Sequence, residues 1–150
     1  MRLKIEQSDD YDDVDITIRC SAVDAPLERL IEQIRLYGFA LQGKKDGTTT
    51  LIPPEEIFYF ESIDGKTFIY KEKSVYECEL RLYEIEERFC RGTFVRISKA
   101  TILNIQKLKS FRTQLNGKLE AQLLNGERLE VNRHYVPDLK ARLAEMGGLS

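Results

Sequence analysis

The chain has 150 residues, of which 42% are hydrophobic and 32% charged, and its formal net charge is -2. This length suits one domain with a small extension, and the composition excludes a largely disordered chain. No apolar run is long enough to cross a bilayer and the first ten residues lack the apolar centre of a signal peptide, so we expect a cytoplasmic protein.

Charge is distributed unevenly along the chain. Residues 91–142 contain 11 Lys and Arg against 4 Asp and Glu, whereas residues 46–90 contain 5 against 11 and residues 1–45 contain 7 against 9. A basic segment within an acidic chain is compatible with phosphate binding, although an ordinary solvated surface can also be basic.

Residues 1–40 are expected to form an N-terminal extension of two strands and a helix. Alternating apolar residues predict strands over Met1–Glu6 and Ile16–Cys20, with an Asp-rich loop between them. A helix with an apolar stripe should follow, capped by Asp24 and ended by Gly38. The extension has no phosphoacceptor cluster and is too short for a response-regulator receiver. It could be a dimerisation unit, a partner-binding unit or a cap over the rest of the protein.

Residues 41–150 are expected to form the main domain, because turn dipeptides alternate there with β-rich segments. Four dipeptides are typical of tight hairpins in which both central residues have positive φ: Asp46-Gly47, Asp64-Gly65, Asn116-Gly117 and Asn125-Gly126. The first two should join residues 41–45 to 48–52 and residues 58–63 to 67–70. The last two should connect a three-stranded meander over residues 108–131, in which Leu119, Ala121 and Leu123 face inward.

Two short helices interrupt the β pattern. Each has an apolar stripe at helical spacing, followed by a glycine that can end the helix. The stripes, which we expect to face the core, are Leu82, Ile85 and Phe89 before Gly92, and Val136, Leu139, Leu143 and Met146 before Gly147.

The stretch Phe94–Asn104, FVRISKATILN, combines a strand with an exposed corner. Alternation places Phe94, Arg96 and Ser98 on one face of the strand and Val95 and Ile97 on the other. The alternation is lost at Lys99 and Ala100 and apolar residues then return. Such a corner is either a solvated turn or a rigid platform that presents polar side chains to a partner.

Little in the sequence points to catalysis. His134 is the only histidine, there is no P-loop or GxGxxG, and the carboxylate clusters lie on predicted solvated surfaces. Cys20, Cys78 and Cys90 lack metal-ligand spacing and are predicted to be reduced thiols, mostly within the core. We therefore expect a protein that is not an enzyme and that needs no metal and no cofactor.

FVRISKATILN resembles the signature of LytTR-type DNA-binding domains of bacterial transcription regulators. The likeness extends from IPPEEIFYFESIDGKTFIY through LRLYEIEERF to LNGKLEAQLLNGERLEVNRHYV, and so covers roughly Leu51 to Leu143. It implies an α+β fold, mostly antiparallel β, built as an elongated stack of small sheets (a LytTR-like β sandwich) with short flanking helices. Loops rather than a recognition helix would enter the DNA grooves.

The resemblance implies a sequence-specific regulator that binds double-stranded DNA, with contacts carried by Lys66, Ser98, Lys99 and Arg133. Either lysine can serve phosphates or guanine acceptors, and the planar fork of Arg133 can read guanine in the major groove. The second-rank candidates are Arg96, Asn132 and His134. Asn104 matches the end of the signature but is expected to satisfy backbone groups in a turn.

The resemblance also bears on partners. Few base contacts per domain favour a homodimer on repeated half-sites, and a co-encoded small membrane protein is expected as a regulator by analogy. Relatives usually carry Ser where this chain has Ala100, so the corner lacks a hydroxyl. This difference supports an alternative, a non-catalytic β-rich protein-interaction or regulatory module that has lost DNA affinity.

Overall fold

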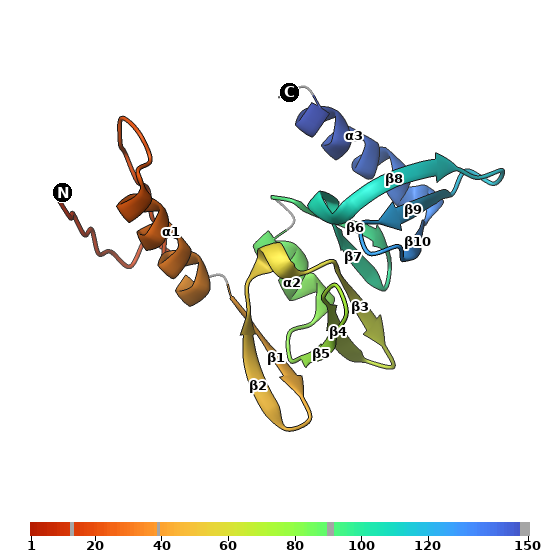
Figure 1. The fold of residues 1–150 in the computed structure, drawn as a ribbon, viewed down its shortest axis with the longest axis horizontal. Coiled ribbons are helices and arrows are strands. Elements are labelled where there is room, and N and C mark those ends of the chain that lie inside the picture. The colour runs from red at the N-terminus through yellow and green to blue at the C-terminus, as the bar shows by residue number, and fades with distance from the viewer. Residues whose placement is uncertain (13, 39, 90–91, 148–150) are drawn as a thin grey trace.

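The structure is a computed structural model that describes residues 1–12, 14–38, 40–89 and 92–147 (Figure 1). Three 3-10 turns, η1 (Pro54–Glu56), η2 (Ile105–Lys107) and η3 (Arg133–Tyr135), accompany the helices and strands. In chain order these are α1 (Ala25–Gly38), β1 (Leu41–Lys45), β2 (Thr48–Ile52), β3 (Tyr59–Ile63), β4 (Lys66–Tyr70), β5 (Val75–Cys78), α2 (Leu82–Phe89), β6 (Phe94–Ser98), β7 (Thr101–Asn104), β8 (Leu108–Thr113), β9 (Leu119–Leu123), β10 (Arg128–Val131) and α3 (Val136–Gly147).

The strands form two antiparallel sheets, which confirms the predicted α+β class. The first sheet has seven strands in the order β2-β1-β5-β4-β3-β7-β6, and the second has three in the order β10-β9-β8. The first is larger than expected because Lys44 of β1 pairs with Glu77 of β5. Gly43 permits this approach, since a Cβ at that position would lie 2.7 Å from the Cβ of Tyr76.

The predicted positive φ at both central residues is confirmed at two of the four turn dipeptides. Asp46 and Asp64 both have φ of 51°, and the glycine after each is also in the left-handed region, as a type I′ hairpin turn requires. At Asn116-Gly117 and Asn125-Gly126 only the glycine has positive φ, so the prediction for both central residues is wrong there. Those turns are longer, and a longer hairpin loop needs one left-handed residue to close it.

Two hydrophobic clusters cover opposite faces of the seven-stranded sheet. Phe94 packs into the cluster beneath α2, while its neighbours Val95 and Ile97 pack into the cluster shared with the second sheet and α3. The predicted alternation along β6 is therefore confirmed, because each face of the strand meets a different core. In α3, Leu139 is fully buried but Met146 is 41% exposed, so the stripe ends before Met146, contrary to the prediction.

The described cysteines differ in their surroundings. Cys78 is buried, and burial raises the pKa of its thiol, which keeps it neutral and unreactive. Cys20 is exposed, so its predicted place in the core is wrong. Cys90 lies outside the described residues.

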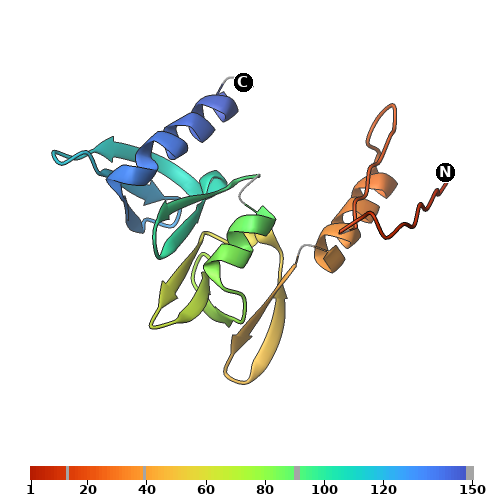
Figure 2. The same ribbon diagram turned by 180° about the vertical axis from the view of Figure 1, so that it is seen from behind.

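The N-terminal unit, residues 1–38, is only partly as predicted. Helix α1 is confirmed and Asp24 caps it, its Oδ1 accepting a hydrogen bond of 2.9 Å from the amide of Leu27. The strands predicted over Met1–Glu6 and Ile16–Cys20 are wrong for a single chain, because a strand needs a hydrogen-bonded partner and neither segment pairs with another described segment. Figures 1 and 2 show this unit set apart from the sheets.

Contacts at the β9–β10 turn fix the two sheets relative to each other. Within the seven-stranded sheet, the rings of Tyr59 on β3 and Tyr70 on β4 stack with centroids 4.2 Å apart. Burial, followed by a hydrogen bond to Glu127 in the β9–β10 turn, raises the pKa of Tyr59, which therefore stays protonated. The side-chain amide of Asn125 donates to the carbonyl of Glu72 at 3.1 Å. These links make the second sheet a rigid support for the elements that follow it.

Candidate nucleic-acid interface

The β6–β7 corner, residues Ser98–Thr101, is the tight turn predicted from the alternation. Ser98 pairs with Thr101 while Arg96 pairs with Ile102, so Ile97 is an extra residue in a bulge. The amide of Ala100 donates to the hydroxyl of Ser98 at 3.2 Å. The bulge and this hydrogen bond together hold Lys99 at the outermost point of the corner, where its side chain is exposed.

The side chain of Arg96 stabilises the corner through hydrogen bonds to its backbone carbonyls. Its Nε donates to the carbonyl of Ser98 at 2.8 Å and one terminal nitrogen donates to the carbonyl of Lys99. The other terminal nitrogen forms an ion pair of 2.6 Å with Glu86 of α2. Because its guanidinium is used in this way, Arg96 positions the corner; that it contacts DNA stays a prediction.

The β3–β4 turn lies beside the corner. Asp64 and Gly65 form its tip, and Lys66 follows as the first residue of β4 with an exposed side chain. The amide of Ser62, near the end of β3, donates to the carbonyl of Ala100 at 2.8 Å. This bond connects the hairpin that carries Lys66 to the corner that carries Lys99.

The η3 turn lies on the other side of the corner. The amide of Asn132 donates to the carbonyl of Ile97 at 2.8 Å, and the Asn132 side chain caps η3 by accepting from the amide of His134 at 3.1 Å. Arg133 and His134 are both exposed. Asn132 thus positions these two side chains through its cap, and its own contact with DNA stays a prediction.

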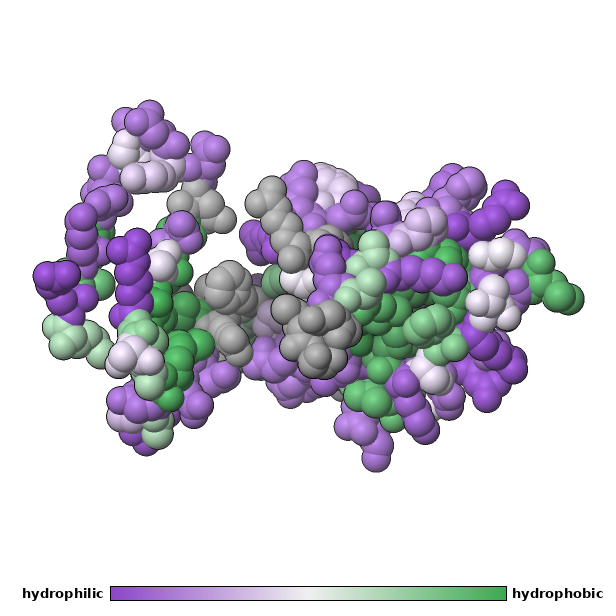
Figure 3. Space-filling model, turned by 90° about the horizontal axis from the view of Figure 1, so that it is seen from above, coloured by the Kyte–Doolittle hydropathy of each residue, from purple (hydrophilic) through white to green (hydrophobic). Residues whose placement is uncertain are grey.

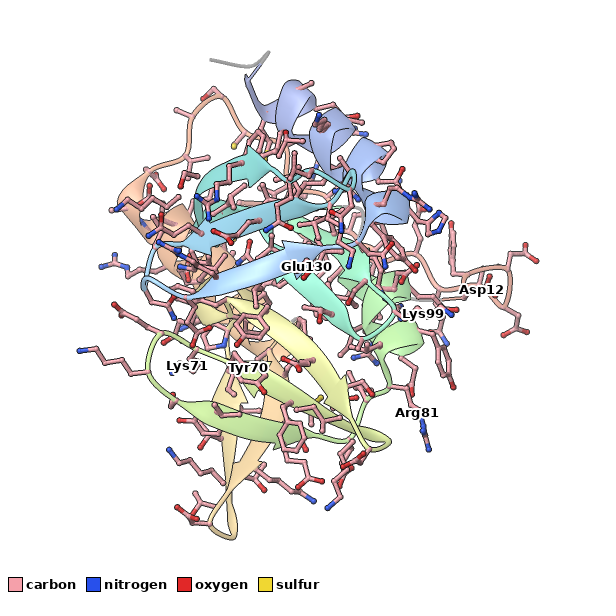
Figure 4. All side chains as sticks on the ribbon, turned by 90° about the vertical axis from the view of Figure 1, so that its right-hand side faces the viewer. Asp12, Tyr70, Lys71, Arg81, Lys99 and Glu130 are labelled. Atoms are coloured by element: carbon pink, nitrogen blue, oxygen red, sulfur yellow. The ribbon has the colours of Figure 1, made fainter. Side chains whose placement is uncertain are left out.

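Three neighbouring elements make up what we call the loop face: the β3–β4 turn, the β6–β7 corner and η3. All three project toward the right-hand side of Figure 1, and that side faces the viewer in Figure 4, where Lys99 is labelled. Backbone hydrogen bonds join the corner to both neighbours. The turns that carry Lys66, Lys99 and Arg133 are therefore neighbours, although these residues are far apart in the sequence.

The charges on the loop face are available to a ligand. Within the described part of the chain, the side chains of Lys66, Lys99 and Arg133 have no hydrogen-bond or ion-pair partner. Several cations elsewhere in the described residues are instead held by carboxylates: Lys44 lies 2.6 Å from Glu79, and Lys118 lies 2.7 Å from Glu130. Exposed, unpaired cations on rigid turns can bind phosphates and base edges without first breaking an internal ion pair.

Asn104 has the structural role expected of it. It is fully buried, its amide nitrogen donates to the carbonyl of Ile57 at 2.8 Å, and its oxygen accepts from the amide of Gln106 at 3.1 Å. Both bonds anchor the end of β7. Ala100 is half-buried. Its amide donates to the hydroxyl of Ser98 and its carbonyl accepts from the amide of Ser62, so the hydrogen bonds of the corner do not need a hydroxyl at that position.

Two residues that shape the loop face could not be identified from the sequence. Glu86 belongs to a cluster of glutamates on α2 that was expected to be solvated, and nothing local marks it as the partner of Arg96. Gly117 is a turn glycine with positive φ, but a Cβ there would also lie 3.0 Å from the Cδ of Arg133. The side chain of Arg133 therefore rests on the β8–β9 turn.

Neither a metal site nor a membrane-spanning helix is present among the described residues. Among those that the structure describes, no group of three or more His, Cys, Asp and Glu residues could hold a metal ion. The described helices include none with the length and apolar character that crossing a bilayer requires.

Comparison with known proteins gives a family match and several similar relatives. A family model described as the LytTr DNA-binding domain matches residues 47–144. The sensory transduction protein LytT of Enterococcus faecalis is 28% identical over 93 residues, which cover 62% of this chain and 38% of LytT. An uncharacterised HTH-type transcriptional regulator of Staphylococcus aureus is 26% identical over 104 residues, which cover 69% of this chain and 70% of that protein.

A solved structure shares the fold. A LytTr DNA-binding domain from Bacillus cereus superposes with a TM-score of 0.66 at 22% identity, covering 69% of this chain and 95% of that domain. The chain therefore shares the architecture of that domain, while it spans well under half the length of LytT.

Proposed function

The chain belongs to the LytTr DNA-binding domain family, and from that membership we propose that it is a sequence-specific, non-enzymatic transcription regulator that binds double-stranded DNA through the loop face. In the described residues no two α-helices are consecutive, so the proposal does not use a helix-turn-helix. The corner, the β3–β4 turn and η3 would enter the grooves instead. Lys66 and Lys99 would bind phosphates or guanine acceptors, and Arg133 would read a base pair.

One observation carries this proposal: three cations without internal partners lie on neighbouring turns that backbone hydrogen bonds hold together. An ordinary solvated surface has no need to hold the turns that carry its lysine and arginine residues at fixed separations. A surface that binds along a duplex does need its cation-bearing turns at fixed separations, because phosphates and base edges recur at fixed intervals.

An electrophoretic mobility-shift assay tests the proposal. The probes are the DNA upstream of the chain's own coding region and duplexes selected from a random pool. The triple variant Lys66→Ala, Lys99→Ala, Arg133→Ala should lose the shift. A matched triple variant, Lys44→Ala, Lys71→Ala, Arg128→Ala, removes the same charge from cations that are paired with carboxylates, and it should keep the shift. A wild-type protein that prefers no duplex would support a protein-interaction module instead.

Lys99→Ala should weaken binding to all sequences by a similar factor. Because Lys99 is proposed to contact a phosphate, its removal should make the slope of log Kd against log salt shallower by about one. Binding measured by fluorescence anisotropy at several salt concentrations gives that slope. An unchanged slope would remove Lys99 from the phosphate contacts.

We further propose that the N-terminal unit forms a homodimer. Leu3 and Ile5 are 83% and 80% exposed, and Ile16 and Ile18 are 57% and 40% exposed, so apolar residues on two extended segments lack a cover. Figure 3 shows apolar surface along α1 in the same unit. A small membrane protein, the other partner expected from the resemblance, stays a prediction.

The charges on the second extended segment favour a second copy of the chain as the partner. If two copies pair antiparallel about Thr17, Asp15 lies opposite Arg19 and Ile16 lies opposite Ile18. Both kinds of pair occur twice across the symmetry axis. Each copy would supply the hydrogen-bonded neighbour that the other lacks.

The homodimer predicts a defined change in mass. Wild-type chain should sediment as a dimer at micromolar concentration, whereas Ile18→Glu should sediment as a monomer because it places a charge in the apolar seam. Thr17→Gln, on the other face of the same segment, is the control: it faces its own copy across the axis without introducing a charge and should remain largely dimeric. A monomeric wild type, or equal behaviour of both variants, would contradict the proposal.

A further inference from the structure

The β8–β9 turn, residues Gln114–Gly117, carries an apolar side chain that nothing in the described protein covers. Leu115 at its tip is 109% exposed, more than in an extended reference chain. In Figure 1 the turn projects beyond the sheets on the same side as the loop face, and Figure 3 shows apolar surface at that extremity.

The turn is rigid and lies directly beside Arg133. The amide of Gln114 donates to the carbonyl of Lys118 at 2.8 Å, and the amide of Gly117 donates back to the carbonyl of Gln114 at 3.3 Å. The stem of Arg133 rests on Gly117, where a Cβ would lie only 3.0 Å from its Cδ. The turn therefore extends the loop face past the residue proposed to read a base pair.

The turn is also free of charge. Gln114, Leu115, Asn116 and Gly117 are neutral, and the cations on either side of them are held by carboxylates: Arg112 lies 3.2 Å from Glu120, and Lys118 lies 2.7 Å from Glu130. An uncharged tip with an exposed leucine is suited to an apolar contact rather than to a phosphate. In the major groove, the apolar feature of a base edge is the 5-methyl group of thymine.

We propose that Leu115 enters the same major groove as Arg133 and packs against the methyl group of a thymine, so that this turn is a further specificity-determining element. The inference rests on the proposed DNA-binding function. It assigns thymine to a position at a fixed distance from the base pair of Arg133. Burial of one methyl group changes affinity by about fourfold.

Replacement of single thymines by deoxyuridine tests the inference, because it removes the methyl group and leaves base pairing unchanged. In a duplex selected by the wild-type protein, one such replacement should weaken wild-type binding by about fourfold. Leu115→Ala should bind the unmodified duplex about fourfold more weakly and should no longer respond to deoxyuridine at that position. Its salt slope should equal that of the wild type, since no charge is involved.

Leu51→Ala is the matched control, because Leu51 of β2 is also exposed, at 59%, but lies away from the loop face. It should respond to deoxyuridine as the wild type does. Insensitivity of the wild type at every thymine, or an undiminished response of Leu115→Ala, would overturn the inference while leaving the DNA-binding function intact. Failure of the wild type to select any duplex would overturn the proposed function, and with it this inference.

Discussion

Replacing Arg133 by alanine is expected to relax sequence preference at one base pair of the binding site. The exposed guanidinium of Arg133 has no internal ion pair, and its stem is held against Gly117, so its fork is pre-positioned for the two acceptors of guanine. Loss of a bidentate contact costs about 1–3 kcal/mol, which is about 5- to 150-fold in Kd. Competition between the selected duplex and each single-base variant measures the change.

The controls separate base reading from charge. Arg133→Lys keeps the charge but loses the fork, so it should relax the same base pair while retaining most non-specific affinity. Arg128→Ala removes an arginine that lies 3.7 Å from Glu120 and should leave the preference intact. An equal loss of affinity for every duplex would instead assign Arg133 to the DNA backbone.

Replacing Asn104 by alanine is expected to lower the free energy of unfolding more than any other substitution considered above. Asn104 is fully buried and makes two hydrogen bonds, one to the carbonyl of Ile57, a residue that is itself fully buried. Leaving buried polar groups unpaired costs about 1–3 kcal/mol each, so the free energy of unfolding should fall by about 2–4 kcal/mol. For a chain of this size the melting temperature should fall by roughly 5–15 °C.

Two further variants serve as comparisons, one for the donated hydrogen bond and one as a control. Asn104→Asp keeps the acceptor for Gln106 but cannot donate to Ile57, so it should also be strongly destabilised at neutral pH. Asn116→Ala removes an exposed asparagine from the β8–β9 turn and should change the free energy of unfolding by less than about 0.5 kcal/mol. A stable Asn104→Ala protein in chemical denaturation would show that the end of β7 does not depend on this anchor.

The local features of the fold could be predicted from the sequence because they depend on neighbouring residues. The two Asp-Gly turns, the cap at Asp24 and the alternation along Phe94–Ser98 are set by backbone preferences and by the period of a strand. The buried role of Asn104 was also predicted. The failed strand predictions fall where a segment needed a partner: residues 1–6 and 16–20 have the pattern of strands, but no other described segment forms hydrogen-bonded pairs with them.

By itself the sequence determined the positions of the hairpin turns in the main domain, the strands beside them, the three helices and the family. Only the tertiary structure decided that β1 and β2 join the larger sheet, that Arg96 pairs with Glu86, and that the stem of Arg133 rests on Gly117. It also decided that the turns carrying Lys66, Lys99 and Arg133 are neighbours. The physical reason is that turn chemistry and alternation act over a few residues, whereas each of these contacts joins residues that are distant in the chain and meet only when both cores are packed.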